Sequence, residues 1–210
     1  MFSTGTKCYD CGAVFHANKF HLTCVKCGGM IDHEYDFRAI RAFVRRKDFH
    51  ARQVSHWKYA PFYPIRDARN AISMGEGNTP LIPSARHETF QFKFEGVNPT
   101  GSFKDRGSTV EISKAREMGV LKVVCASTGN MGASIAAYAE RAGMHATVFV
   151  PAFAPARKVM EMKSYGANVH RVRGSYDDAL HASWDAALGK NVFLAGDYPL
   201  RCEGQKSIAF

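Results

Sequence analysis

Lys104 stands where a loop turns into a helix, and its neighbours are of types that suit a reacting amine. The segment reads Asn98-Pro-Thr-Gly-Ser-Phe-Lys104-Asp-Arg-Gly107, with turn-forming residues before the lysine and a helical pattern after it. The positive end of a helix dipole disfavours an ammonium ion, so it favours the neutral amine that forms a Schiff base. A solvated lysine in the first turn of a helix is the simpler hypothesis for this position alone.

A second loop, Ser127-Thr128-Gly129-Asn130-Met131-Gly132, follows an apolar strand pattern and opens a helix. Its N–H groups and hydroxyls could surround a carboxylate, because the first N–H groups of a helix have no partner within it. The Asn130 amide could donate to a phenolate oxygen. A plain capping turn explains the same residue types, since Ser, Thr and Asn are good N-caps.

Four of the six cysteines have the spacing of metal ligands. Cys8 and Cys11 form one Cys-x2-Cys pair, Cys24 and Cys27 form another, and 12 residues separate the pairs. Four thiolates complete a tetrahedral shell, so we expect a structural Zn²⁺ that stabilises a short ribbon. Iron in a rubredoxin-like site and four reduced cysteines without metal are the alternatives.

The part of the chain after Gly75 alternates short apolar runs with longer amphipathic ones, which is typical of parallel strands joined by crossover helices. Glycines follow the helical runs as stop signals, and Ser175 is a good N-cap. We therefore expect an α/β fold with a doubly wound, mostly parallel sheet, which binds ligands at the carboxyl ends of its strands. The expected strands are 90–95, 122–126, 146–150, 168–172 and 192–195, and the expected helices are 103–118, 130–142, 154–165 and 176–188.

Composition divides the chain into a zinc-ribbon-like module (1–31), a basic and aromatic linker (32–74) and an α/β domain (75–210). The net charge of +9 is concentrated between Arg38 and Arg69, which carry a net +7, so the remaining chain is close to neutral. A ribbon followed by this basic stretch also fits a nucleic-acid-binding protein, a remote alternative that leaves both loops unexplained. No apolar run reaches the roughly 20 residues that span a bilayer, and the first residues lack a secretory signal, so we expect a cytoplasmic protein without membrane or nucleic-acid partners.

Further motifs occur along the chain together with the two loops. Taken in order, the motifs are Trp57-Lys-Tyr59, Gly75-Glu-Gly-Asn-Thr-Pro-Leu81, Asn98 to Gly107, Ser127 to Asn130, and Glu203-Gly-Gln-Lys-Ser207. Through these motifs the chain resembles fold-type II pyridoxal-phosphate enzymes of the tryptophan synthase beta type, and its Asp105-Arg106 pair most resembles the threonine synthases. Some of those enzymes also carry an amino-terminal zinc ribbon.

The resemblance implies a lyase of threonine biosynthesis that converts O-phospho-L-homoserine and water to L-threonine and phosphate. Lys104 would bind pyridoxal 5'-phosphate covalently and move protons on the substrate, and Asn130 would hydrogen-bond the cofactor ring oxygen. Ser127, Thr128 and Asn130 would hold the substrate carboxylate, and Arg201 its phosphate. The loop that binds the cofactor phosphate would lie beyond the last residue, so we expect the chain to be the incomplete, amino-terminal half of an enzyme. The resemblance is also compatible with a homodimer.

Two departures from the family pattern concern the substrate. Met131 replaces a common threonine, and Ala195-Gly196 replaces Asn-Ser, so polar groups for a substrate phosphate are missing. These two departures leave a second hypothesis open, in which the chain belongs to another enzyme of the same fold type, either a serine or threonine ammonia-lyase or a beta-replacement synthase.

Overall fold

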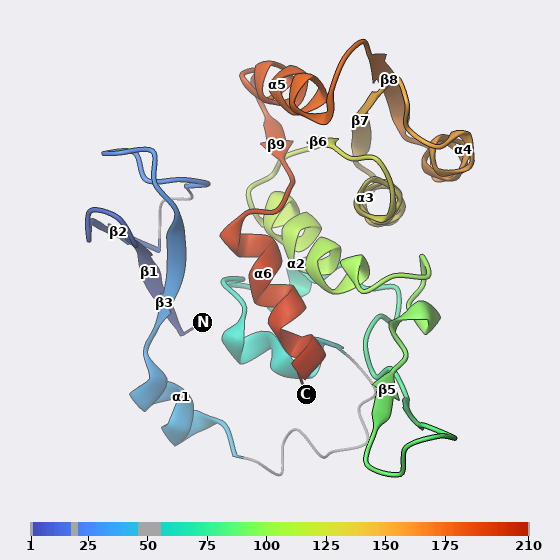
Figure 1. Ribbon diagram of the computed structural model, residues 1–210. Coiled ribbons are helices and arrows are strands. Elements are labelled where there is room, and N and C mark those ends of the chain that lie inside the picture. The colour runs from blue at the N-terminus through green and yellow to red at the C-terminus, as the bar shows by residue number, and fades with distance from the viewer. Residues whose placement is uncertain (1, 18–20, 46–55, 210) are drawn as a thin grey trace.

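The computed structural model describes residues 2–17, 21–45 and 56–209. It places a small antiparallel sheet beside a larger α/β part (Figure 1). Sections of the predicted ribbon (1 and 18–20) and linker (46–55), and the last residue of the α/β domain (210), lie outside the described residues.

The amino-terminal sheet has the order β2-β1-β3, with β1 (Ser3–Cys8) pairing antiparallel with β2 (Val14–His16) and β3 (Ile31–Tyr35). Helix α1 (Phe37–Phe43) follows it. Because β3 pairs with β1 as far as Tyr35, this sheet continues past residue 31, the predicted end of the ribbon. Its buried apolar cluster is very small: Cys8, Ala13, Cys24 and Ile31.

The larger part is built on a parallel sheet of order β8-β7-β6-β9. The strands are β6 (Lys122–Ala126), β7 (His145–Pro151), β8 (Asn168–Val172) and β9 (Val192–Leu194), which confirms four expected strands to within one residue. Continuous apolar runs such as Val123 to Ala126 are buried, as expected for strands covered on both faces.

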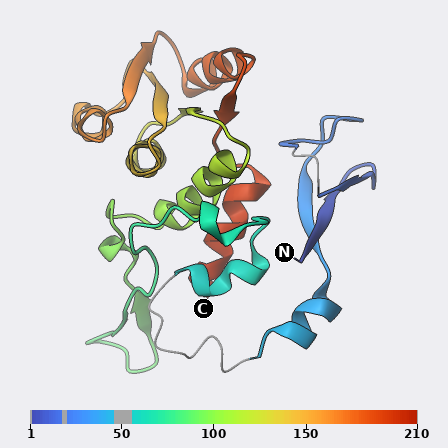
Figure 2. The ribbon, with the colours of Figure 1, turned by 180° about the vertical axis from the view of Figure 1, so that it is seen from behind.

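Helices cover both faces of this sheet, which confirms the doubly wound fold. In Figures 1 and 2, α3 (Asn130–Arg141) and α4 (Ala156–Ser164) lie on one side and α5 (Tyr176–Ala187) on the other. The chain moves outward from β6 through β7 to β8 and then returns to place β9 on the other side of β6. The carboxyl ends of β6 and β9 therefore flank the point where strand order reverses, which we call the switch point; ligands bind there in folds of this type.

Most of the predicted helix ends are confirmed. Gly119, Gly143 and Gly166 have φ values of 72°, 69° and 79° just past their helices, the left-handed conformation that glycine adopts at little cost. Ser175 forms a capping box with Asp178 at the start of α5. Gly189 does not take the left-handed conformation, which instead occurs at Asn191 with φ 58°.

The expected strand 90–95 does not belong to the parallel sheet. Its central residues form β5 (Gln91–Lys93), which pairs antiparallel with β4 (Leu81–Pro83) as a separate two-stranded sheet. The aromatic side chains of the segment caused the error, because Phe90, Phe92 and Phe94 read as core residues but are exposed. A 3-10 turn, Glu95–Val97, links β5 to the lysine loop.

Helix α2 (Lys104–Glu117) is packed between α3 and α6 (Pro199–Gln205), and the 3-10 segment Lys206–Ala209 continues α6. Glycine permits the close approach of α2 and α6. A Cβ on Gly107 would lie 2.6 Å from Arg201 Cγ, and one on Gly204 would lie 1.9 Å from the Arg106 carbonyl oxygen.

The second part of the predicted linker packs on the α/β core. It contains the 3-10 segments His56–Phe62 and Ala68–Asn70, and Tyr63, Ile65 and Ile72 belong to the main apolar cluster. The small sheet contacts α6 through the Tyr35 hydroxyl, which lies 2.7 Å from both Glu203 Oε2 and the Phe62 carbonyl oxygen.

Among the residues that the structure describes, no helix is both long enough and apolar enough to cross a membrane.

Candidate active site and cysteine cluster

The amino-terminal ends of α2 and α3 lie side by side at the switch point. Asp105, the second residue of α2, accepts a hydrogen bond from the Ser134 hydroxyl at 2.6 Å, and the same hydroxyl lies 2.7 Å from Ser108 Oγ. Lys104 is one residue before Asp105, and Asn130 is about one helical turn before Ser134. The two residues expected to hold the cofactor thus begin neighbouring helices.

The loop before Lys104 is held by the polar residues of its own motif. Asp105, fully buried, accepts from the Thr100 backbone N–H at 2.8 Å and from its hydroxyl at 2.5 Å. Burial raises the pKa of Asp105, against these hydrogen bonds, which lower it. Asn98 accepts from the Gly77 N–H at 2.9 Å, which connects the lysine loop to the Gly75-to-Leu81 motif.

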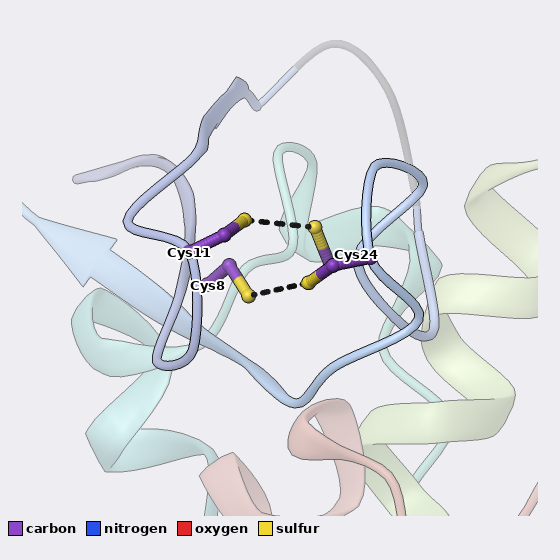
Figure 3. A group of neighbouring side chains, drawn as sticks. Cys8, Cys11 and Cys24 are labelled. Carbon is purple, nitrogen blue, oxygen red and sulfur yellow. Dashed lines mark hydrogen bonds between the residues drawn. The ribbon is translucent and has the colours of Figure 1, made fainter.

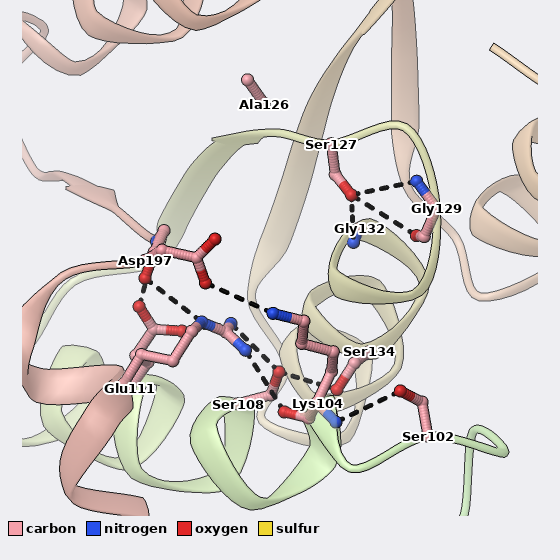
Figure 4. Close-up of polar contacts among 12 residues, drawn as sticks. Ser102, Lys104, Ser108, Glu111, Ala126, Ser127, Gly129, Gly132, Ser134 and Asp197 are labelled. Atoms are coloured by element: carbon pink, nitrogen blue, oxygen red, sulfur yellow. Dashed lines mark hydrogen bonds and ion pairs between the residues drawn. The ribbon is translucent and has the colours of Figure 1, made fainter. Parts of the chain in front are cut away.

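The Lys104 side chain is 22% exposed, so a small molecule can reach it. Its Nζ lies 3.4 Å from Asp197 Oδ1, and Asp197 follows β9 (Figure 4). Asp197 is not among the residues predicted from the sequence, although it follows another strand at the same edge of the sheet as the predicted loop after β6. The rule that ligands bind beyond the carboxyl ends of strands could have identified it.

The loop after β6 combines a turn-forming hydroxyl with more accessible side chains. Ser127 Oγ accepts from the N–H groups of Gly129 (3.2 Å) and Gly132 (2.9 Å), so this hydroxyl caps the turn (Figure 4). Thr128 is partly exposed and Asn130 is exposed. The loop therefore presents Thr128 and Asn130 to the switch point while Ser127 fixes its shape.

Arg201 does not occupy the position expected of a substrate-phosphate ligand. Its side chain is 0% exposed and forms an ion pair with Glu111, itself 1% exposed. The guanidinium also donates to the carbonyl oxygens of Gly196 and Lys104 and to Ser108 Oγ, each at 3.2 Å. Contact with a substrate would require breaking this buried network, so in this structure Arg201 supports the site from beneath.

Glu111 was not anticipated from the sequence. Burial raises its pKa to about 7, although Arg201 and the Gly196 N–H, which donates to Glu111 Oε1 at 3.0 Å, both favour the carboxylate. With that N–H and the guanidinium as partners, the ionised form has the donors it needs.

The four predicted metal ligands come together at the end of the small sheet (Figure 3). All four sulfurs lie within 4.8 Å of one another, and the Cys8–Cys27 and Cys11–Cys24 Sγ distances are both 3.6 Å. Tetrahedral zinc with Zn–S bonds of about 2.3 Å requires sulfurs about 3.8 Å apart, so the cluster fits that ion.

The electrostatics of the cluster also favour a cation. Burial raises the pKa of Cys24, but hydrogen bonds from the backbone N–H groups of Lys26 and Cys27, together with those from the Cys11 and Cys27 thiols, outweigh it and bring the pKa to about 7. The Gly29 N–H likewise favours the Cys27 thiolate, yet the three neighbouring sulfurs raise the pKa of Cys27 to about 12. Four thiolates cannot ionise together without a compensating positive charge.

Comparison with known proteins agrees with this geometry. The family model "Pyridoxal-phosphate dependent enzyme" matches residues 72–210. A threonine synthase of Methanocaldococcus jannaschii is 39% identical over 97% of this chain and 52% of its own length. One of Synechocystis is 43% identical over 72% of this chain and 42% of its own. These relatives confirm the resemblance to threonine synthases, and the chain spans about half of their length.

Solved structures show the same fold. A pyridoxal 5'-phosphate-dependent aspartate racemase matches with a TM-score of 0.56 and 30% identity, covering 62% of this chain and 43% of that one. The processed threonine deaminase isoform 2 of Solanum lycopersicum matches with a TM-score of 0.56 at 24% identity over 62% of this chain and 38% of that one, a likeness of fold alone. With the family model matching most of its length, this chain belongs to the family of pyridoxal-phosphate dependent enzymes.

Proposed function

We propose that this chain is the cofactor-carrying part of a threonine synthase, which converts O-phospho-L-homoserine and water to L-threonine and phosphate. The observation that carries the proposal is the position of Lys104. It begins α2 beside the Asn130 end of α3, at the switch point, and its amine is accessible. The threonine synthases that match most of the chain support the choice of reaction.

Pyridoxal phosphate supplies the electron sink that stabilises a substrate carbanion when it is bound. The protein residues orient the reactants and move protons. Lys104 is the residue that binds the cofactor and carries protons to and from the substrate carbons through Nζ. Asn130 donates to the cofactor ring oxygen. Thr128, Asn130 and the first N–H groups of α3 bind the substrate carboxylate, which the positive end of the helix dipole favours. Ser127 contributes by holding the turn that aims them.

The second candidate is an ammonia-lyase or beta-replacement synthase that acts on an unphosphorylated amino acid. Three observations at the expected phosphate position favour it. Arg201 is buried and already paired, Ala195-Gly196 offers no side-chain donor, and the Asp197 carboxylate would repel a phosphate dianion.

The four cysteines hold a structural Zn²⁺ in this proposal, since their separations suit it and four ligands leave no open position. We place the enzyme in the cytoplasm, where thiols stay reduced. We also propose a homodimer, the commonest assembly among soluble oligomeric proteins.

The reaction is tested with the complete protein that contains this chain, loaded with pyridoxal phosphate. Phosphate and threonine should appear together from O-phosphohomoserine. Release of ammonia from serine or threonine, without phosphate release from O-phosphohomoserine, would select the second candidate. Borohydride reduction followed by peptide mass spectrometry should place the cofactor on Lys104; a label on another lysine would reject the site itself.

A further inference from the structure

The two peptide groups that flank the Cα atom of Gly196 are each held by one member of a buried ion pair. Its N–H donates to Glu111 Oε1 at 3.0 Å, and its carbonyl oxygen accepts from Arg201 Nε at 3.2 Å. Glu111 lies on α2, Arg201 on α6, and the two side chains are 1% and 0% exposed. The backbone that leads into the next residue, Asp197, is therefore fixed from two helices.

The same ion pair also holds the backbone of Lys104. Arg201 Nη1 donates to the Lys104 carbonyl oxygen at 3.2 Å. Glu111 follows Lys104 by seven residues, which is about two helical turns and the same face of α2. One pair of charges thus connects the residue before Asp197 with the lysine whose amine lies 3.4 Å from the Asp197 carboxylate.

Close packing alone does not require these charges. Gly107 and Gly204 already allow α2 and α6 to touch, and well-packed apolar side chains often stabilise such an interface as well as a buried ion pair does. What apolar side chains cannot supply is an acceptor for the Gly196 N–H and a donor for the Gly196 carbonyl oxygen, which belong to two successive buried peptide groups. The Glu111–Arg201 pair therefore supplies the two hydrogen bonds that hold the Gly196–Asp197 backbone in place.

We propose that Asp197 is a positioning residue for the Lys104 amine, and that the Glu111–Arg201 pair sets the place of Asp197. In the cofactor-free protein the carboxylate directs Nζ toward the switch point through this 3.4 Å contact, in which the Asp197 side chain is 68% exposed and that of Lys104 is 22% exposed. The inference rests on the proposed function only in taking Lys104 as the lysine that binds the cofactor. Its test needs neither cofactor nor substrate, so failure of the test and failure of the proposed reaction are distinguishable.

The contact is tested by acetylation of the complete, cofactor-free protein with acetic anhydride, which modifies only neutral amines. Peptide mass spectrometry gives the rate at Lys104, with the exposed Lys122 as internal reference. In Asp197→Asn, Lys104 should react about two to five times faster, the range that corresponds to a partly exposed ion pair. Asp197→Glu should restore much of the protection.

Asp185→Asn is the matched control, because Asp185 is exposed on α5; it should leave the rate unchanged. An unchanged rate in Asp197→Asn, or an equal increase in Asp185→Asn, would overturn the proposal. In the active enzyme, Asp197→Asn should lower kcat with little effect on KM. A change confined to KM would place Asp197 on the substrate instead.

The role of the ion pair is tested with Glu111→Leu combined with Arg201→Met, which removes both charges together. Lys104 should then react as fast as in Asp197→Asn, and adding Asp197→Asn should have no further effect. Retained protection in the folded double variant would refute the role. Should that variant not fold, amide exchange decides: the Gly196 N–H of the unaltered protein should exchange as slowly as core-strand amides, and rapid exchange would refute its fixation.

Discussion

The contact between α2 and α6 at Gly204 offers a direct test of how Lys104 is placed. A Cβ in Gly204→Ala would lie 1.9 Å from the Arg106 carbonyl oxygen. Carbon and oxygen atoms in close contact are about 3.3 Å apart, so α6 would have to move by up to about 1.4 Å. The obstacle is backbone of a buried helix, which cannot rotate away.

That displacement would lengthen the two hydrogen bonds that Arg201 makes to α2, to the Lys104 carbonyl oxygen and to Ser108 Oγ, both 3.2 Å. Each is a buried bond from a charged donor, worth about 1.5 to 3 kcal/mol. We therefore expect Gly204→Ala to lower the free energy of unfolding by at least about 3 kcal/mol, beyond the usual cost of one added methyl group in a core.

Urea denaturation followed by circular dichroism measures this difference, with Cys202→Ala as control. Cys202 lies on the same helix but is exposed, so its variant should stay within about 0.5 kcal/mol of the unaltered protein. A Gly204→Ala protein as stable as this control would refute the reasoning, since it would show that α2 and α6 do not approach as closely as the structure has them.

Three further predictions concern separate parts of the molecule. Burial lowers the pKa of His56 to about 4. Below about pH 6.5 this imidazole is therefore protonated in the unfolded chain but stays neutral in the folded protein. The contribution of His56 to stability should be complete above pH 6.5 and fall by up to about 3 kcal/mol toward pH 4. The difference between the urea midpoints of the unaltered protein and His56→Gln, measured against pH, should show this contribution. Ser175→Ala removes a capping box and should cost about 1 kcal/mol in the same denaturation assay; no loss would contradict the cap. Cys24→Ser should abolish zinc binding measured by elemental analysis, whereas Cys202→Ser should retain it, and equal zinc in both variants would exclude the cysteine site.

Local signals were sufficient for much of the fold. Runs such as 122–126 and 168–172 contain the side chains that buried strands require, and Ser175 with Asp178 satisfies its own helix end. These features depend on neighbours within a few residues. The pairing of β5 does not, because Phe92 alternates correctly for a strand whether its partner is a buried sheet or the exposed β4.

The candidate residues at the edge of the sheet carry local signals in the sequence. Turn residues and helix starts mark Lys104 and Asn130, and the structure places them at the beginnings of α2 and α3. The burial of Arg201 could not be predicted, because its partner, Glu111, is 90 residues away in the sequence and no local pattern shows that the two meet. Residue type indicates that an arginine can bind a phosphate, whereas its burial decides whether it is available to do so.

The residues of the Asp105-Arg106-Gly107 string are buried and hold the structure around Lys104. Asp105 ties the lysine loop to α3 through Thr100 and Ser134. Arg106, 2% exposed, forms a two-pronged pair with Glu95 at 2.7 and 2.8 Å, and Gly107 leaves room for Arg201. Each residue thus fixes one side of the first turn of α2.

This arrangement makes the position of Lys104 depend on directed polar contacts more than on apolar packing. Apolar cores tolerate exchanges of similar volume, since dispersion contacts have little directionality. A buried carboxylate or guanidinium tolerates few, because each lost partner leaves a charge without compensation. Substitutions around α2 should therefore divide sharply: apolar exchanges such as Ile112→Leu should leave the Lys104 acetylation rate nearly unchanged, while Arg106→Leu should alter both that rate and stability. Equal effects of the two would mean that packing, and not the polar network, places the amine.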